Sequence, residues 1–320
     1  MDILLNVLLF VLGFGALIKG GDILVAGASS IARRFGVPSI VIGLTIVAFG
    51  TSAPELFVNI FAATQGSYEI AFGNILGSNI SNTFLILGVA AVMYPLALQR
   101  NTIWKEIPLS LLAAILLAVM VNDAIFDART FSELSRIDGV VLISFFIVFL
   151  YYTFGMTKIE GTREVIPEFS LPRSSLMVIG GIVLLALGGD FIVDSARFFA
   201  LLIGISEAVI GLTIVAVGSS LPELVTCIVA GIKKEADIGI GNIVGSNIFN
   251  ILFVLGITSL IQPLPFTPNL QVSMVIAVFA AFSLFGIMFI ERKHMLSRMK
   301  GAAFIAAYVL YISYTVFQSF

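Results

Sequence analysis

The sequence has few of the residues that soluble enzymes place at their surfaces and active sites. Only 11% of its 320 residues are charged, whereas an ordinary soluble domain carries roughly a quarter. It has one cysteine and one histidine, which excludes an intramolecular disulfide and a thiolate metal cage. The formal net charge of −2 gives no electrostatic support for binding nucleic acid.

Apolar residues are abundant instead and make up 59% of the chain. Apolar runs recur along the whole length, and several reach the ~18 residues that cross a bilayer. We therefore expect a multi-pass integral protein of the cell membrane, with the lipid bilayer as its solvent. The run from Ile3 follows no basic cluster and has no small-residue cleavage pattern, so it predicts a first membrane helix and not a signal peptide.

One segment occurs twice in the chain. The stretch VIGLTIVAFGTSAPELFVNI from Val41 returns from Val209 as VIGLTIVAVGSSLPELVTCI, with 14 of 20 positions identical. A second stretch, IAFGNILGSNISNTFLILGV from Ile70, returns from Ile238 as IGIGNIVGSNIFNILFVLGI, with 11 of 20 identical. Both pairs are 168 residues apart, so the sequence consists of two copies of one unit.

Charged residues, prolines and glycines divide the apolar stretches into ten expected helices, five in each copy. An odd number of helices per copy places the second copy upside down. Loop charges agree, because 13 Lys and Arg fall in one set of alternate loops and 3 in the other, and the basic side is cytoplasmic. The sequence thus predicts an all-α fold of two inverted five-helix repeats, N-out and C-out, as in secondary transporters. The expected helices are 2–32, 38–63, 70–98, 104–122, 134–155, 173–203, 206–231, 238–262, 270–290 and 300–319. The first repeat covers 1–157, a polar cytoplasmic linker covers 158–172, and the second repeat covers 173–320.

Each copy carries Gly-Thr/Ser-Ser-x-Pro-Glu in the middle of its second apolar stretch. The proline removes a backbone donor and the nearby glycine loosens the same turn, so we expect the helix to break there. Such a break brings carbonyl, hydroxyl and carboxylate oxygens together at mid-membrane, and these are the ligands that Ca2+ and Na+ prefer. The oxygens expected in this site belong to Ala48, Ala216, Thr51, Ser52, Ser219, Ser220, Glu55 and Glu223.

Glu55 and Glu223 are the residues of this set that point most directly to a function. A carboxylate at bilayer depth costs several kcal/mol unless it is paired or lies on a polar pathway. A single buried glutamate is also explained by a hydrogen bond between helices. The same glutamate recurs at the same place in the second copy, which favours one shared cation site.

A second motif, Gly-Asn-x-x-Gly-Ser-Asn-x-x-Asn, occupies the third apolar stretch of each copy. Ser78 and Asn82 are four residues apart and so share one helix face, as do Ser246 and Asn250. Their side-chain oxygens are candidates to complete the cation site. The neighbouring Asn79 and Asn247 point elsewhere, and either ligand support or hydrogen bonding between helices would explain them.

The paired blocks GTSAPE with GSSLPE, and GNILGSNISN with GNIVGSNIFN, resemble the two α-repeats of the Ca2+/cation antiporter superfamily, most closely its Na+/Ca2+ exchanger branch. The resemblance covers both halves. It implies ion sites between the second, third, seventh and eighth helices, and a first and sixth helix that slide across this core. It also implies Ca2+ ligation by Glu55 and Glu223 with carbonyls at Thr51 and Ser219. Sodium would share the glutamates and use Ser52, Ser78, Ser220, Ser246 and the carbonyls of Ala48 and Ala216, with Asn82 and Asn250 at the family's Asn/Asp positions.

Asparagine at both 82 and 250 bears on the choice of ions. K+-dependent members of the superfamily have an aspartate at one of these places, so the resemblance disfavours K+ dependence. The glutamate-bearing motif of the proton-exchanging branch is also missing here. With two glutamates as the only acids, the site carries −2, which one Ca2+ or two Na+ neutralise, and a third Na+ makes the exchange electrogenic.

The sequence therefore predicts a non-enzymatic antiporter that exchanges Na+ for Ca2+ by alternating access and uses no cofactor. An H+/Ca2+ antiporter is the alternative within the same class. General acid/base catalysis by the two carboxylates is a third possibility, although it needs a substrate-sized pocket or a nucleophile, and the motifs include no histidine partner or aspartate pair. A passive channel fits broken helices in an inverted repeat less well than alternating access does.

Overall fold

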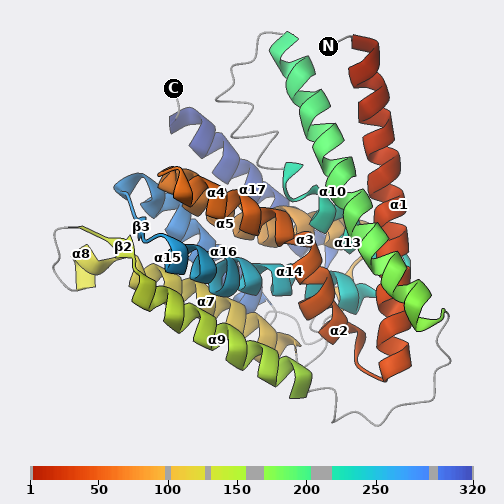
Figure 1. Ribbon diagram of the computed structural model, residues 1–320, viewed down its shortest axis with the longest axis horizontal. Coiled ribbons are helices and arrows are strands. Elements are labelled where there is room, and N and C mark those ends of the chain that lie inside the picture. The colour runs from red at the N-terminus through yellow and green to blue at the C-terminus, as the bar shows by residue number, and fades with distance from the viewer. Residues whose placement is uncertain are drawn as a thin grey trace.

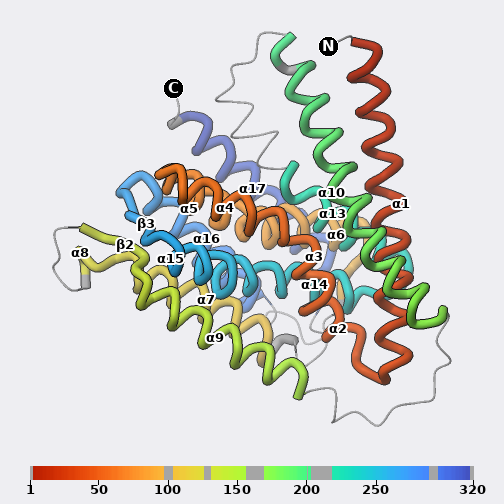
Figure 2. Tube along the Cα trace, viewed as in Figure 1, coloured from red at the N-terminus to blue at the C-terminus, as the bar shows by residue number. Residues whose placement is uncertain are grey.

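The computed structural model describes residues 3–97, 102–126, 131–155, 169–202, 218–287 and 295–318, and these are almost entirely helical (Figures 1 and 2). The first copy contains α1 (Ile3–Phe35), α2 (Ser39–Ile42), α3 (Ala48–Thr51), α4 (Ala53–Thr64), α5 (Tyr68–Ile80), α6 (Leu87–Met93), α7 (Ile107–Met120), α8 (Asp123–Phe126) and α9 (Arg136–Gly155). The second contains α10 (Leu171–Leu202), α13 (Leu221–Ile232), α14 (Ala236–Ile248), α15 (Gly256–Ile261), a 3-10 turn (Pro268–Leu270), α16 (Gln271–Ile287) and α17 (Arg298–Gln318).

Seven helices of the described residues are long and apolar enough to cross a membrane, and the bent pair Ser39–Thr51 and Ala53–Thr64 makes an eighth. Two further predicted helices correspond to shorter pieces. The helix expected at 104–122 is α7, preceded by a π-helical segment from Thr102. Only the second half of the helix expected at 206–231 is described, as α13.

The centre of the molecule is formed by the third predicted helix of each copy. Their spans, Tyr68–Met93 and Ala236–Ile261, are 78% and 83% buried, against 22% for Ile3–Phe35. Each of these spans changes from α-helix to π-helix midway, at Ser81–Ile86 and Phe249–Leu255. The two π-helical segments begin 168 residues apart, and π-turns of this kind are frequent at functional sites.

The long helices α1 and α10 lie antiparallel beside each other at the right in Figure 1, where their upper ends project beyond the other helices. Elsewhere they share an apolar cluster with residues of α2 and α13. Small residues at intervals of seven line their contact and let the two backbones approach closely. A Cβ added at Gly181 would lie 2.7 Å from the Cβ of Leu24. The contacts join Gly13 to Gly188, Gly20 to Gly181 and Gly27 to Ser174.

Two ion pairs connect α1 to the turn between α13 and α14. Lys233 Nζ lies 2.7 Å from Asp22 Oδ1, and Arg33 lies 2.8 Å from Glu235 Oε1. Asp22 also forms a local ion pair with Lys19, three residues earlier on the same helix, at 3.5 Å. These pairs hold the middle and the end of α1 against the second copy.

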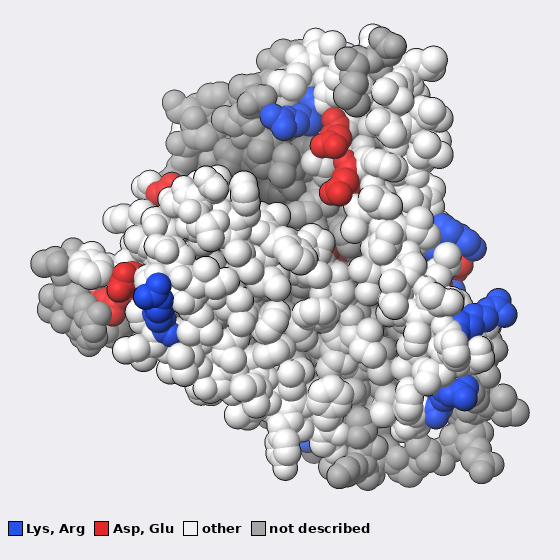
Figure 3. All heavy atoms as spheres, viewed as in Figure 1, with Lys and Arg blue, Asp and Glu red and all other residues white. Residues whose placement is uncertain are grey.

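Short strands, which the sequence analysis did not predict, join the helix ends. β1 (Leu96–Ala97) pairs with β4 (Met295–Leu296), and β2 (Glu133–Leu134) pairs with β3 (Leu264–Pro265). Each pairing joins the two copies. In Figure 3 the charged side chains lie toward the top, left and right of the face shown, and the broad centre of that face is uncharged, which suits contact with lipid.

Candidate cation site

The two Pro-Glu motifs lie where the helices of each copy break, as the sequence predicts. The chain bends by 44° between Ser39–Thr51 and Ala53–Thr64. The residues at the breaks, Ser52 and Ser220, have nearly the same backbone angles, with φ and ψ of −90° and 1° and of −95° and 5°. A proline occupies the first turn of α4 and of α13, where its missing N–H does no harm. The break therefore places Glu55 and Glu223 in equivalent first turns.

The two carboxylates are buried and close enough to interact. Glu55 and Glu223 are each only 2% exposed. Glu223 lies within electrostatic reach of Glu55 and of the Thr51 side chain, both of which belong to the other copy. Two ionised carboxylates buried together repel each other and lose hydration. A cation between them would offset both costs.

Eight buried oxygens of the predicted ligands, one from each glutamate and six from other residues, share one property. Buried oxygens of four repeat-related residue pairs have no hydrogen-bond partner in the described part of the chain, and their residues are at most 4% exposed. Buried polar atoms are normally paired, so such a set suits cation ligation, and six to eight oxygens is the number that Ca2+ takes. The atoms are Oγ of Ser52, Ser220, Ser78 and Ser246, Oε2 of Glu55 and Glu223, and Oδ1 of Asn82 and Asn250.

The remaining predicted ligands are placed differently. Ala48 is fully buried, and its carbonyl accepts the backbone N–H of Ser52 at 3.0 Å and lies 3.4 Å from the Thr51 hydroxyl, which can also donate to it. Thr51 is buried, but its repeat partner Ser219 is exposed. Ala216 lies outside the described residues. All predicted ligands of the first copy are thus buried, whereas in the second copy Ser219 is exposed and residues 203–217 lie outside the described part of the chain.

Asn79 and Asn247, for which the sequence left two explanations, form hydrogen bonds between helices. Asn79 Nδ2 donates to the main-chain oxygen of Asn247 at 3.2 Å, and Asn247 Nδ2 donates to Thr83 Oγ1 at 3.1 Å. Their other atoms contact Asn250 and Asn82. They therefore join the central helices of the two copies.

Asn242 is a site neighbour that the sequence analysis did not single out. It is fully buried, and its Oδ1 accepts the hydroxyl of Thr51 at 3.0 Å. Its repeat partner Asn74 donates to Asn59 Oδ1 at 2.8 Å. Both are the first asparagine of the Gly-Asn-x-x-Gly-Ser-Asn motif, so their recurrence in the two copies is the sequence signal that could have identified them.

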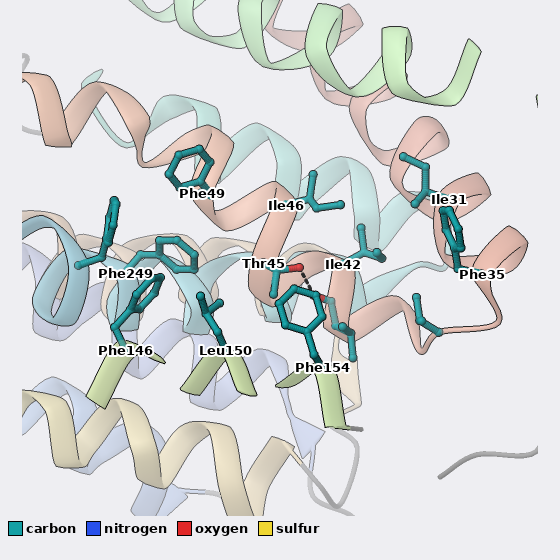
Figure 4. A pocket seen from close by; sticks show the side chains of 13 residues that line it. Ile31, Phe35, Ile42, Thr45, Ile46, Phe49, Phe146, Leu150, Phe154 and Phe249 are labelled. Atoms are coloured by element: carbon teal, nitrogen blue, oxygen red, sulfur yellow. Dashed lines mark hydrogen bonds between the residues drawn. The ribbon is translucent and has the colours of Figure 1, made fainter. Parts of the chain in front are cut away.

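The described residues also line an open apolar pocket of about 530 Å3 (Figure 4). Its walls come from the end of α1, from α2 and α3 with the π-turn between them, from α9, and from the π-helical segment after α14. The polar side chain in its lining is Thr45, whose hydroxyl donates to the carbonyl of Val41 at 2.7 Å. The cavity has no carboxylate in its lining and is separate from the cation site.

Comparison with known proteins gives consistent results. A family model described as "Sodium/calcium exchanger protein" matches residues 5–155 and 173–317. Sodium/calcium exchanger MaX1 of Methanosarcina acetivorans is 33% identical, over 97% of this chain and 98% of its own. The inner membrane protein YrbG of Escherichia coli is 37% identical over 81% of each chain. A solved structure of the sodium-calcium exchanger NCX_Mj superposes with a TM-score of 0.83 and 34% identity, covering 98% of this chain and all of that chain.

Proposed function

Because this chain belongs to the sodium/calcium exchanger protein family, we propose that it is a secondary antiporter that exchanges Na+ for Ca2+ by alternating access. Membership makes it a multi-span membrane protein of a family of cation/Ca2+ antiporters, not of enzymes. The observation that carries the proposal is the set of eight buried oxygens, one from each glutamate and six from serines and asparagines of the two motifs, that have no hydrogen-bond partner among the described residues. Hard oxygen ligands of this kind suit Ca2+ and Na+.

The charge of the site explains why the two ions exclude each other. The proposed ligand set contains two carboxylates and otherwise only neutral hydroxyl, amide and carbonyl oxygens, so it carries −2 when both glutamates are ionised. One Ca2+ or two Na+ neutralise this charge, and both must use the same carboxylates. A third Na+ would leave a net positive carrier, so exchange of three Na+ per Ca2+ would be sensitive to membrane potential.

We further propose that the ten expected helices form two inverted repeats, with both termini outside. Contacts between the copies support this arrangement, because the antiparallel seam joins Gly13 to Gly188 and Gly20 to Gly181. Gly13 and Gly181 are repeat partners, and so are Gly20 and Gly188. The seam therefore makes the same contact twice in opposite directions. The proposed repeats are residues 1–157 and 173–320, with the linker at 158–172 on the cytoplasmic side.

Alternating access requires one part of the molecule to move over the buried site. The pair α1 and α10 is the candidate, because its upper ends project beyond the other helices (Figure 1). It contacts the second copy through apolar residues of α13, such as Val225 and Val229, and through ion pairs such as Lys233 with Asp22. The residue equivalent to Lys233 in the first copy is Gln65, which forms no ion pair. The attachment of the moving pair is therefore stronger on one side of the membrane than on the other.

The test is Ca2+ flux into proteoliposomes driven by one gradient at a time. We expect an outward Na+ gradient to drive 45Ca2+ uptake and a pH gradient alone to drive none. Uptake driven by a pH gradient and indifferent to Na+ would replace the proposal with H+/Ca2+ exchange. Uptake that needs no counter-ion would indicate a channel. An uptake rate that is the same at all membrane potentials would contradict the exchange of three Na+ per Ca2+.

A further inference from the structure

Four asparagines at the centre of the molecule form two hydrogen bonds that are copies of each other. Asn82 Nδ2 donates to Asn247 Oδ1 at 3.0 Å, and Asn250 Nδ2 donates to Asn79 Oδ1 at 3.0 Å. Asn79 and Asn247 are 168 residues apart, as are Asn82 and Asn250. The same amide contact is thus made twice, and each bond crosses from one copy to the other.

The orientation of one of these contacts is fixed by the backbone. Asn79 Nδ2 donates to the main-chain oxygen of Asn247 at 3.2 Å, and a carbonyl oxygen can only accept. The oxygen of the Asn79 amide must therefore face Asn250. Asn250 in turn must present its NH2 to that oxygen, which turns its own Oδ1 to the opposite side.

The second contact has the same orientation with a different anchor. Asn247 Nδ2 donates to Thr83 Oγ1 at 3.1 Å, and Asn247 Oδ1 accepts a hydrogen bond from the NH2 of Asn82. As a result, Oδ1 of Asn82 and Oδ1 of Asn250 are both buried and have no hydrogen-bond partner among the described residues. Asn82 lies one helical turn after Ser78, and Asn250 lies one turn after Ser246. The Oγ atoms of these serines are also buried without a hydrogen-bond partner among the described residues.

We infer that Asn79 and Asn247 are positioning residues, which hold the amides of Asn250 and Asn82 with their oxygens toward the cation. The inference rests on the proposed function. An amide presents either an oxygen, which binds a cation, or N–H donors, which repel it. Asn79 and Asn247 each accept a hydrogen bond from the NH2 group of a ligand amide, so that only the oxygen of that amide faces the ion.

The test compares Asn79→Leu with the wild type, because leucine has a similar size but neither accepts nor donates a hydrogen bond. The amide of Asn250 then loses its fixed orientation, and its NH2 loses its acceptor. We expect the Kd for Ca2+, measured by 45Ca2+ equilibrium dialysis in Na+-free buffer, to rise about tenfold. The maximal exchange rate at saturating Ca2+ should change by less than about twofold, because the ligands themselves remain. Asn79→Ala, which removes the same amide without branching, replaces the leucine variant if that variant does not fold.

A double-mutant cycle separates positioning from a structural role. If Asn79 acts through Asn250, then Asn79→Leu should have almost no further effect on Ca2+ affinity in a protein that already carries Asn250→Leu. Thr258→Val is the matched control, because the Thr258 hydroxyl is buried and donates to Val254 at 2.7 Å, outside the site. Its effect on Ca2+ affinity should be small and the same in both backgrounds.

Each outcome decides the inference. Coupled effects of Asn79 and Asn250 on Ca2+ affinity support it. The inference is overturned if Asn79→Leu has unchanged Ca2+ affinity, or if the effects in the cycle are additive. In that case Na+-driven uptake by the wild type still supports the proposed function. A wild type that binds Ca2+ but does not exchange it for Na+ overturns the proposed counter-ion, and the cycle still tests the asparagines. A wild type that does not bind Ca2+ overturns both.

Discussion

Removal of one site carboxylate is the most informative perturbation of this protein. Glu55→Gln or Glu223→Gln keeps the shape of a side chain that is 2% exposed but reduces the proposed site charge from −2 to −1. Breaking a buried charge pair costs about 3–5 kcal/mol, and about 4 kcal/mol corresponds to a roughly thousandfold loss of Ca2+ affinity. Coulomb energy scales with ion charge, so Na+ should lose about half as much energy, or roughly thirtyfold in affinity.

The assay is 45Ca2+ uptake driven by a Na+ gradient, together with 45Ca2+ binding to the purified protein. Glu106→Gln is the matched control, since Glu106 is 1% exposed and has one carboxylate oxygen without a partner in the described residues. Its other oxygen accepts the hydroxyl of Tyr152 at 2.9 Å, away from both motifs. We expect Glu106→Gln to transport with near-normal Ca2+ affinity. Full activity of Glu55→Gln and Glu223→Gln, or an equal loss in the control, would refute the reasoning.

Three further predictions concern movement and competition. Lys233→Ala removes the ion pair with Asp22; the two side chains are 29% and 45% exposed, so the pair contributes less than about 1 kcal/mol. The variant should change the ratio of apparent Ca2+ affinities on the two membrane sides by up to about fivefold. The same ratio in the variant and the wild type, measured in oriented vesicles, would count against this role. Gly181→Val would place a Cβ 2.7 Å from the Cβ of Leu24 in α1. The resulting overpacking costs about 1–3 kcal/mol and should slow exchange at least about fivefold, while Ca2+ binding persists. A normal exchange rate would show that exchange does not need the close contact between α1 and α10. Protons and Ca2+ compete for the oxygens of Glu55 and Glu223, so lowering the pH should raise the KM for Ca2+ and saturating Ca2+ should restore the rate; a lower maximal rate at unchanged KM would place the pH effect elsewhere.

The sequence predicted the helices well wherever composition alone decides. Runs of apolar residues long enough to cross a bilayer have no stable alternative in lipid, because backbone N–H and C=O groups must bond within the segment. The broken helix before Glu55 was predictable for an equally local reason, since proline lacks a donor. Its counterpart before Glu223 followed from the repeat. The confirmed features are therefore those that depend on chain-local chemistry.

Other features could not be predicted from the sequence, because they depend on which residues meet. The strand pairs β1 with β4 and β2 with β3 contain only two residues each, too short for any periodicity. The π-helical turns at Ser81–Ile86 and Phe249–Leu255 have no recognised sequence signal. The ion pair of Lys233 with Asp22 joins residues 211 positions apart in the sequence, and spacing along the chain does not reveal it.

The Pro-Glu pair shows the division most clearly. By itself the sequence determined that two copies of one unit each carry a glutamate at membrane depth, and the cost of burying that charge identified a functional site. Only the tertiary structure decided that Glu55 and Glu223 lie close enough to interact, and that the oxygens around them lack partners in the described residues. It also decided that Asn79 and Asn247 hydrogen-bond to the opposite copy. The physical reason is that ligand type is a property of each residue, whereas the direction of an amide or carboxylate depends on the neighbours that the fold brings to it.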